Sequence, residues 1–226
     1  MEGKVYGVKN GKNQSNMSRK DVKNDCIICE VAKTCLKRIE ELSDPNNNPK
    51  LTPVDGYEGK IFIHDNSDMN DLSQNIEEAK HIIDAGFDHI KHIIINPHII
   101  EKWLPNQEYT FFYKDGRKLY GDRKGVQGES GITSSFSRAV NDQCDKVLLI
   151  EFDTQFKQNR LRLDNIAKNL YFRLNDFTEG RIFECYIARD GYVVRFDKEF
   201  LTSGTKEEVK KRIIKLLEPM RTKKEG

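Results

Sequence analysis

The stretch YTFFYKDGRKLYGDRK, from Tyr109 to Lys124, carries the clearest fold signal in this sequence of 226 residues. Its middle, Lys114–Arg117, places an Asp-Gly pair between segments in which apolar and polar residues alternate. An Asp-Gly pair favours a tight turn whose backbone twist suits two antiparallel strands. We therefore expect a β-hairpin with strands at Tyr109–Tyr113 and Leu119–Lys124.

Further strands and helices are expected on both sides of this hairpin. Apolar runs predict strands at Lys60–His64, Phe87–Ile95, Val147–Phe152, Ile182–Ala188 and Tyr192–Phe196. Helical spacing predicts helices at Leu72–Ala85, Ser130–Gln143, Asn159–Leu174 and Thr205–Leu217, the last opened by a capping box. This order predicts an α/β fold, with α+β as the alternative, built on a mixed central sheet flanked by helices.

The first 48 residues differ in character from the rest of the chain. Residues 1–19 are rich in Lys, Asn, Gly and Ser, so we expect a mobile arm with one short strand at Val5–Val8. From Lys20 to Leu42 apolar residues recur at helical spacing, and Asp44–Pro49 then ends the helix. We therefore divide the chain into an N-terminal arm and helix at 1–48 and an α/β domain at 49–226.

The composition excludes several classes of protein. Lys and Arg number 38 against 36 Asp and Glu, which gives a formal net charge of +2 and argues against a strongly basic nucleic-acid coat protein. No apolar run has the length of a membrane helix, and the N-terminus has no secretory signal, so we expect no membrane partner. With five cysteines, an odd number, reduced thiols and a cytoplasmic location are the simplest interpretation.

Familiar catalytic motifs are missing from the sequence. It has no Gly-rich phosphate loop, nucleophile elbow or dinucleotide fingerprint, which argues against NTPases, Rossmann oxidoreductases and α/β-hydrolases. Cys26 and Cys29 have the spacing of half a zinc site, but the sequence supplies no matching second pair. We interpret these cysteines, together with Cys35, as apolar residues on the buried side of a helix.

Two carboxylates and a lysine are expected to meet near the end of the hairpin. Strand alternation places Asp122 and Lys124 on one face of the sheet, and Glu108 on the neighbouring strand reaches the same place. Two carboxylates supply the oxygen ligands that a hard divalent cation such as Mg²⁺ or Mn²⁺ prefers. Such a cation polarises a phosphate and activates water, while Lys124 orients the water or neutralises developing charge.

Residues that contact a substrate are expected beside these groups. The start of the helix after the hairpin is rich in hydroxyl side chains, and a helix N-terminus suits a phosphate; these residues are Ser130, Thr133, Ser134 and Ser135. Arg123 belongs to a basic patch around the hairpin that suits a nucleic-acid backbone.

A plainer interpretation of the same residues stays open. Asp122 and Lys124 also fit an ordinary solvated strand face, and Glu108 fits an ordinary carboxylate at a strand edge. The acidic-x-Lys pattern recurs at Glu2/Lys4, Asp21/Lys23, Glu58/Lys60, Glu78/Lys80 and Glu208/Lys210. The features that set Asp122 apart are the predicted strand end, the flanking Gly121 and Gly125, and the Ser-rich helix start that follows.

A set of short motifs between about residues 72 and 198 resembles a known family. The motifs are Ile76-Glu-Glu-Ala-Lys80, Gly86-Phe-Asp-His-Ile90, Asn106-Gln-Glu-Tyr109, Lys114-Asp-Gly-Arg117, Gly121-Asp-Arg-Lys124 and Ala139-Val-Asn-Asp-Gln143. They look like the C-terminal nuclease toxin domains of contact-dependent inhibition (CDI, CdiA-like) and related polymorphic toxin systems, which are similar to restriction endonucleases. The resemblance implies a metal-dependent nuclease, often acting on tRNA, with Glu77, Glu108, Asp122 and Lys124 at the matching positions.

One departure from the family pattern separates two functional hypotheses. Where the family has Pro-Asp, this chain has Pro105-Asn106-Gln107-Glu108. If Glu108 replaces the missing acid, we expect an enzyme that cuts nucleic acid, RNA in preference to DNA, and that pairs with an inhibitor (immunity) protein. If Asn106 occupies the position of the metal ligand, we expect a degraded module that binds nucleic acid or protein without catalysis.

Overall fold

The fold is seen in a computed structural model, which describes residues 33–44, 46, 50–100, 106–143, 145–152 and 161–221. The expected strand at Val5–Val8, the first part of the helix at 20–42, and Cys26 and Cys29 lie outside the described residues. Within the described ranges, no helix has both the length and the apolar character needed to cross a membrane.

The described chain forms one mixed sheet in which the strands follow each other in chain order. The strands are β1 (Leu51–Pro53), β2 (Ile61–His64), β3 (Ile90–Ile95), β4 (Tyr109–Tyr113), β5 (Lys118–Val126), β6 (Val147–Phe152), β7 (Glu184–Arg189) and β8 (Tyr192–Asp197). The pairs β2–β3, β5–β6 and β6–β7 are parallel, and the other neighbouring pairs are antiparallel. The predicted α/β fold with a mixed sheet flanked by helices is therefore confirmed.

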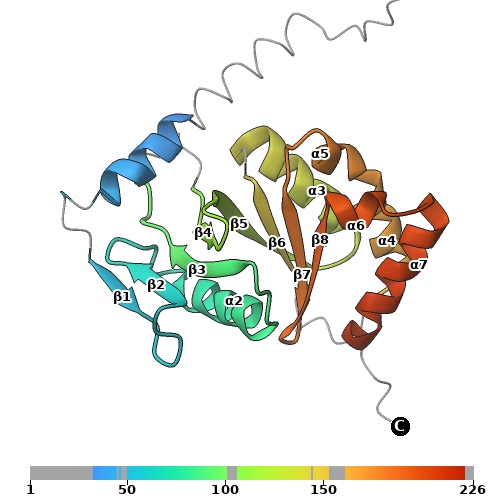
Figure 1. Cartoon of the computed structure of the whole chain (residues 1–226), viewed down its shortest axis with the longest axis horizontal. Coiled ribbons are helices and arrows are strands. Elements are labelled where there is room, and N and C mark those ends of the chain that lie inside the picture. The colour runs from blue at the N-terminus through green and yellow to red at the C-terminus, as the bar shows by residue number, and fades with distance from the viewer. Residues whose placement is uncertain are drawn as a thin grey trace, which may run out of the picture.

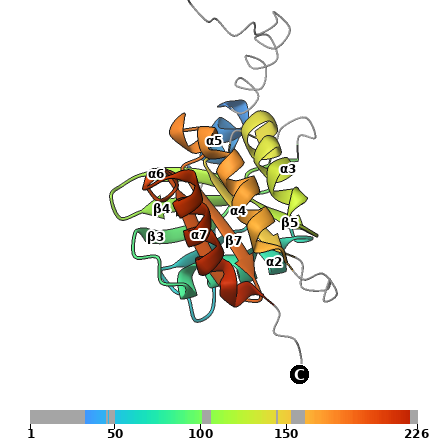
Figure 2. The ribbon, with the colours of Figure 1, turned by 90° about the vertical axis from the view of Figure 1, so that its right-hand side faces the viewer.

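Helices cover both faces of this sheet (Figure 1). The helical segments are α2 (Leu72–Asp84), α3 (Ser130–Arg138), the π-helical turn η2 (Ala139–Gln143), α4 (Leu163–Phe172), α5 (Leu174–Thr178), α6 (Lys198–Thr202), α7 (Lys206–Leu217) and the 3-10 turn η3 (Glu218–Met220). Figure 2 shows α4 and α7 lying across one face, where Phe136 and Ile213 share a core with Leu148. Helix α2 packs on the other face, where Ile82 joins Phe111.

The N-terminal helix contributes a smaller core of its own. Residues 33–42 are helical, and Cys35 and Ile39 are buried against Ile99, with Tyr120 of β5 packed alongside. The Sγ of Cys35 donates to Oε1 of the buried Gln107, 2.7 Å away. Cys35 is therefore a buried helix residue, as expected.

Several expected elements differ from the observed ones, for tertiary reasons. Strand β3 begins at Ile90 and not at Phe87, because Ile90 N–H donates to the Phe87 carbonyl in a turn. Strand β5 runs on to Val126, because its parallel pairing with β6 continues as far as Phe152. The helix expected over Ser130–Gln143 is α-helical to Arg138 and then widens into η2.

A close approach between β5 and β6 fixes the strand that carries Asp122. Gly121 lies beside Val147, and a Cβ atom on Gly121 would be 2.5 Å from the Val147 carbonyl oxygen. The absence of a side chain therefore allows the two strands to pair directly next to Asp122.

Candidate active site

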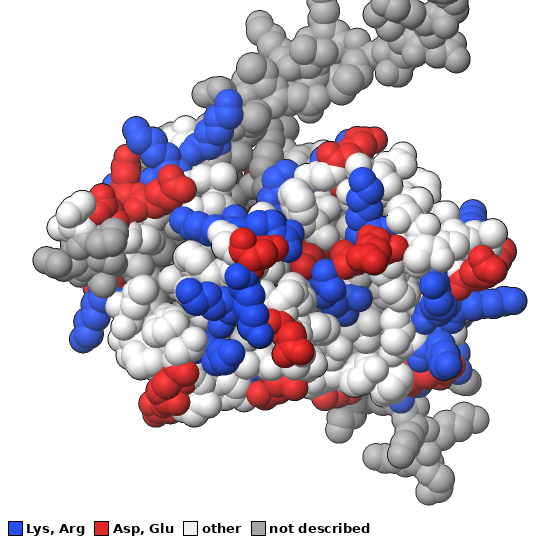
Figure 3. All heavy atoms as spheres, in the orientation of Figure 1, with Lys and Arg blue, Asp and Glu red and all other residues white. Residues whose placement is uncertain are grey.

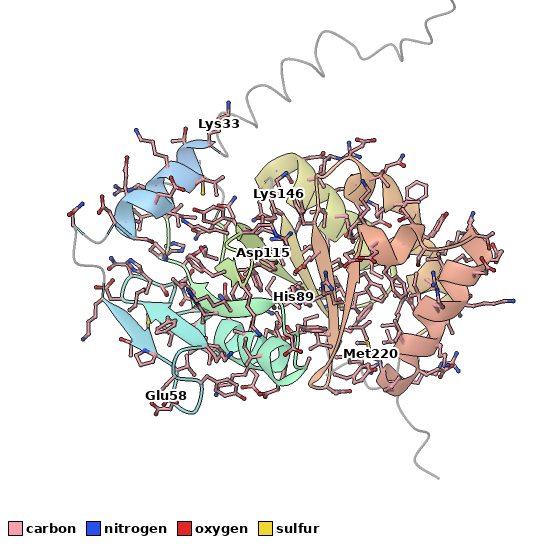
Figure 4. All side chains as sticks on the ribbon, viewed as in Figure 1. Lys33, Glu58, His89, Asp115, Lys146 and Met220 are labelled. Carbon is pink, nitrogen blue, oxygen red and sulfur yellow. The ribbon has the colours of Figure 1, made fainter. Side chains whose placement is uncertain are left out.

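A polar pocket of about 220 Å³ lies where β3 ends and β4 begins. Its lining comes from the segment before α2 and the first turn of that helix, the end of β3 and the following loop, the residues directly before β4, β5 and the end of η2. The lining residues are Asp68, Asp71, Asn75, Ile95, Asn96, Pro97, His98, Asn106, Glu108, Asp122, Lys124 and Gln143. In Figure 4 the hairpin turn at Asp115 lies near the centre of the view, and the pocket is at the opposite end of β4.

Glu108, Asp122 and Lys124 all line this pocket. Tyr109 pairs with Gly121 at the end of the antiparallel ladder, so Glu108, directly before β4, and Asp122 of β5 follow this pair on the two chain segments. Lys124 follows two residues after Asp122 and forms an ion pair with it through Nζ and Oδ2. The expectation that strand alternation puts Asp122 and Lys124 on one face is therefore confirmed.

The electrostatics of Glu108 and Lys124 reflect their removal from water. Burial is the main cause that raises the pKa of the Glu108 carboxyl, with the charge of Asp71 adding to it. Burial also lowers the pKa of the Lys124 ammonium, against the opposing effects of Asp145 and Glu108. Groups whose pKa values move toward neutral pH are suited to proton transfer and to charge stabilisation.

Asp145 does not line the pocket, but its charge acts on Lys124, and the sequence analysis did not single it out. It is fully buried, and neither carboxyl oxygen has a hydrogen-bond partner within the described part of the chain. Burial raises its pKa well above the usual range for Asp, while the charge of Lys124 lowers it. A polar residue directly before an apolar strand gives no sequence signal of this kind, because its burial depends on tertiary packing.

Asn106 has a structural role at the rim of the pocket. Its Oδ1 accepts a hydrogen bond from Ile99 N–H at 3.0 Å, and its Nδ2 lies 2.6 Å from Nδ1 of His98. Its backbone carbonyl accepts from Nε2 of Gln143 at 3.3 Å. Glu108, two residues later, is the residue that brings a carboxylate into the pocket from this segment.

Glu77 does not line the pocket. Its side chain is 61% exposed and lies 3.4 Å from His81 Nε2 on the same helix. The next residue, Glu78, is buried on the α2 side of the sheet, where burial and then Glu151 raise its pKa to about 8. From this part of the chain it is Asp71 and Asn75, at the start of α2, that reach the pocket.

The residues expected to bind substrate are also placed elsewhere. Arg123 points to the opposite face from Asp122, where it donates to Glu151 at 2.7 Å and to Asn75 Oδ1 at 3.2 Å. Ser134 and Ser135 both donate to the Gly131 carbonyl within their own helix. Among the described lining residues, Gln143 at the far end of the segment takes the place of Ser130, Thr133, Ser134 and Ser135.

The donor set of Glu108 and Asp122 fits a divalent cation. Glu108 Oε2 and Asp122 Oδ1 are buried, and neither has a hydrogen-bond partner among the described residues. The described residues contain no group of three or more His, Cys, Asp or Glu side chains that could hold a metal. Mg²⁺ is commonly bound through one or two carboxylates, with water and substrate phosphate completing its shell, so two carboxylates are sufficient.

Charges on the outer surface are mixed. On the face shown in Figure 3, Lys and Arg side chains are interspersed with Asp and Glu. The pocket differs from this pattern, because four carboxylates line it (Asp68, Asp71, Glu108 and Asp122) against one lysine, Lys124. A pocket with this balance attracts cations.

Comparison with known proteins gives one distant structural neighbour to report. No protein-family model matches the chain, and no curated protein matches it. A chain of the CdiA-CT/CdiI toxin and immunity complex from Burkholderia pseudomallei is similar, with 12% sequence identity and a TM-score of 0.37. The match covers 57% of this chain and 85% of that chain. A similarity at this level assigns no function, which has to follow from the residues of the pocket.

Proposed function

We propose that this chain is a metal-dependent nuclease domain that hydrolyses phosphodiester bonds, with RNA, including tRNA, favoured over DNA. The observation that carries the proposal is the meeting of Glu108, Asp122 and Lys124 in one pocket, where each carboxylate has a buried oxygen with no hydrogen-bond partner among the described residues. The preference for RNA and the restriction-endonuclease-like character rest on the motif resemblance between residues 72 and 198.

Each residue has a role that its surroundings support. Glu108 and Asp122 would hold Mg²⁺ or Mn²⁺, which supplies Lewis-acid polarisation of the phosphate and a water of lowered pKa. Lys124 faces the same pocket and is held by Asp122, so it is placed to stabilise negative charge that develops on the phosphate. Burial of these groups strengthens each of these interactions relative to water.

The acidic lining gives a reason for the metal requirement. Asp68 and Asp71 add negative charge beside Glu108 and Asp122, and a phosphodiester carries a negative charge of its own. Lys124 alone does not offset this repulsion. A divalent cation held by Glu108 and Asp122 would offset it, so we expect cleavage to depend on the metal.

The proposal is tested by cleavage of tRNA and of plasmid DNA in Mg²⁺, Mn²⁺ or EDTA. We compare the natural chain with Asp122→Asn, which keeps the shape of the side chain and removes its charge. Asp190→Asn is the matched control, because Asp190 is exposed in the β7–β8 turn at φ 50°, a conformation that Asn tolerates. Cleavage that needs metal, survives Asp190→Asn and fails in Asp122→Asn supports the proposal; cleavage that Asp122→Asn leaves unchanged refutes it.

A toxin role and an inhibitor protein remain predictions from the motif resemblance. The toxin in the distant neighbour is described in complex with an immunity protein, and that statement concerns the neighbour. The alternative hypothesis, a degraded module without catalysis, requires that Asn106 occupies the position of the metal ligand, so that the pocket lacks a carboxylate from this segment. Glu108 supplies a carboxylate there, and this placement favours the catalytic hypothesis.

A further inference from the structure

His98 stands on the rim of the pocket, and the proposed chemistry gives it no role. The residue lines the pocket and its side chain is 40% exposed. The segment that carries it is held against the loop before α2, because His98 N–H donates to the Asn66 carbonyl at 2.7 Å. Ser67 Oγ donates to the Ile95 carbonyl at 3.1 Å and strengthens the same contact. The backbone that positions the imidazole is therefore held at His98 and at Ile95.

Two side chains compete for Nδ1 of this imidazole, and they require opposite protonation of it. Asn106 Nδ2 lies 2.6 Å from Nδ1, and Asp68 Oδ2 lies 3.3 Å from it. An amide N–H needs a lone pair on Nδ1, whereas a carboxylate needs a proton there. The state of Nδ1 decides whether the other nitrogen, Nε2, carries a proton in the neutral ring.

The orientation of the Asn106 amide settles this competition. Ile99 N–H donates to Oδ1 of Asn106 at 3.0 Å, so the oxygen of the amide faces Ile99 and the NH₂ group faces His98. The contact with Asp68 is longer, and the Asp68 side chain is 30% exposed, where water screens its charge. Asn106 therefore donates to Nδ1, and the proton of the neutral imidazole lies on Nε2.

Nε2 is the nitrogen of His98 that has no partner among the described residues. We infer that His98 presents Nε2–H to the substrate and donates a hydrogen bond to an oxygen of the bound phosphodiester. The inference rests on the proposed function, and it makes His98 a substrate-binding donor and not a general base. It also gives Asn106 a positive role, since an Asp at this position has no N–H to donate to Nδ1.

Two variants test the roles of Nδ1 and Nε2 of His98 separately, because each keeps a polar group at only one of the two positions. The amide of Asn reaches the place of Nδ1, so His98→Asn keeps the contact with Asn106 and loses the outward donor. The amide of Gln reaches the place of Nε2, so His98→Gln keeps an outward donor and loses the inner acceptor. We expect His98→Asn to weaken binding of a short RNA oligonucleotide by about tenfold or more, as loss of one hydrogen bond to a charged group does, and His98→Gln to retain most of the affinity.

The test combines this binding assay with ¹⁵N NMR of the histidine ring in the natural chain. A proton on Nε2 whose signal shifts when the oligonucleotide is added, together with weak binding by His98→Asn alone, supports the inference. A neutral ring with its proton on Nδ1 overturns the inference. An affinity of His98→Asn for the oligonucleotide equal to that of the natural chain overturns it as well. A natural chain that neither binds nor cleaves nucleic acid refutes the proposed function and this inference together, whereas failure of the inference alone leaves metal-dependent cleavage in place.

Discussion

Glu108, directly before β4, and Asp122 of β5 follow the antiparallel pair Tyr109–Gly121 and line the same pocket. Each carboxylate has one buried oxygen without a partner in the described chain, and Lys124 occupies the other Asp122 oxygen. Leaving such oxygens unsatisfied costs about 1–3 kcal/mol each in an ordinary core. A bound cation removes that cost, so the pair is best understood as a site that metal binding completes.

Replacing Lys124 is expected to separate catalysis from metal binding. Lys124→Met keeps the length of the side chain and removes the charge that faces the phosphate, so we expect cleavage to fall by about 100-fold or more. Both oxygens of Asp122 then become available, so stabilisation of the fold by Mn²⁺ persists. Cleavage rates and thermal melting with and without Mn²⁺ measure the two effects, and Lys118→Met, on the same strand but outside the pocket, is the control. If Mn²⁺ no longer raises the melting temperature of Lys124→Met, then Lys124 takes part in metal binding and the division of roles between Lys124 and the two carboxylates is wrong.

Strand pairing beside the site is expected to depend on Gly121. Gly121→Ala places a Cβ atom 2.5 Å from the Val147 carbonyl oxygen, and overpacking of this kind costs about 1–3 kcal/mol in the free energy of unfolding. Gly125→Ala, on the same strand, meets no atom within 4 Å and is expected to leave stability nearly unchanged. Urea unfolding of the two variants checks the difference, and equal stabilities would contradict the close approach of β5 and β6.

The buried Glu78 is expected to make stability fall as the pH rises. Its pKa in the folded chain is about 8, above the ordinary value of 4.5, so the folded state holds a proton that the unfolded state releases. Stability is therefore greatest below the unfolded pKa and falls between pH 4.5 and about pH 8. Burial is the main cause, and Glu151 and Glu77 add to it while the charge of Arg123 opposes it.

A matched pair of variants tests the contribution of Glu78. Glu78→Gln removes the ionisation and is expected to stabilise the fold at pH 8 by about 2–4 kcal/mol, with much less effect at pH 5. Glu77→Gln, at the next position but exposed, is expected to change the pH dependence little. Denaturant unfolding at both pH values measures this, and the expectation fails if the two variants respond to pH in the same way.

The part of the site that local sequence signals define was predictable. The hairpin rests on the Asp115-Gly116 turn, and strand alternation then fixes the shared face of Asp122 and Lys124. Glu108 followed from its position directly before Tyr109. These three placements need only the pairing of two adjacent strands, which the turn itself determines.

The other features of the site depend on how elements distant in the sequence pack together, and a single sequence does not show that packing. The rotation of α2 about its axis decides that Asn75 and not Glu77 faces the pocket, and this rotation is set by packing of Ile82 on the sheet. The extension of β5 to Val126 moves the Ser-rich start of α3 beyond the pocket and brings Gln143 to it. The burial of Asp145 and the contact between Asn106 and His98 likewise arise from tertiary structure.

The most direct test of the central claim is Mn²⁺ binding to the natural chain, to Glu108→Gln, to Asp122→Asn and to the double variant, measured by isothermal titration calorimetry. We predict that the natural chain binds one Mn²⁺ and that either single substitution weakens this binding by about tenfold or more. In the double variant, the loss of binding free energy is expected to be less than the sum of the two single losses, because both residues bind one ion. Absence of binding, or equal affinity in all four chains, would contradict the claim that Glu108 and Asp122 form one cation site.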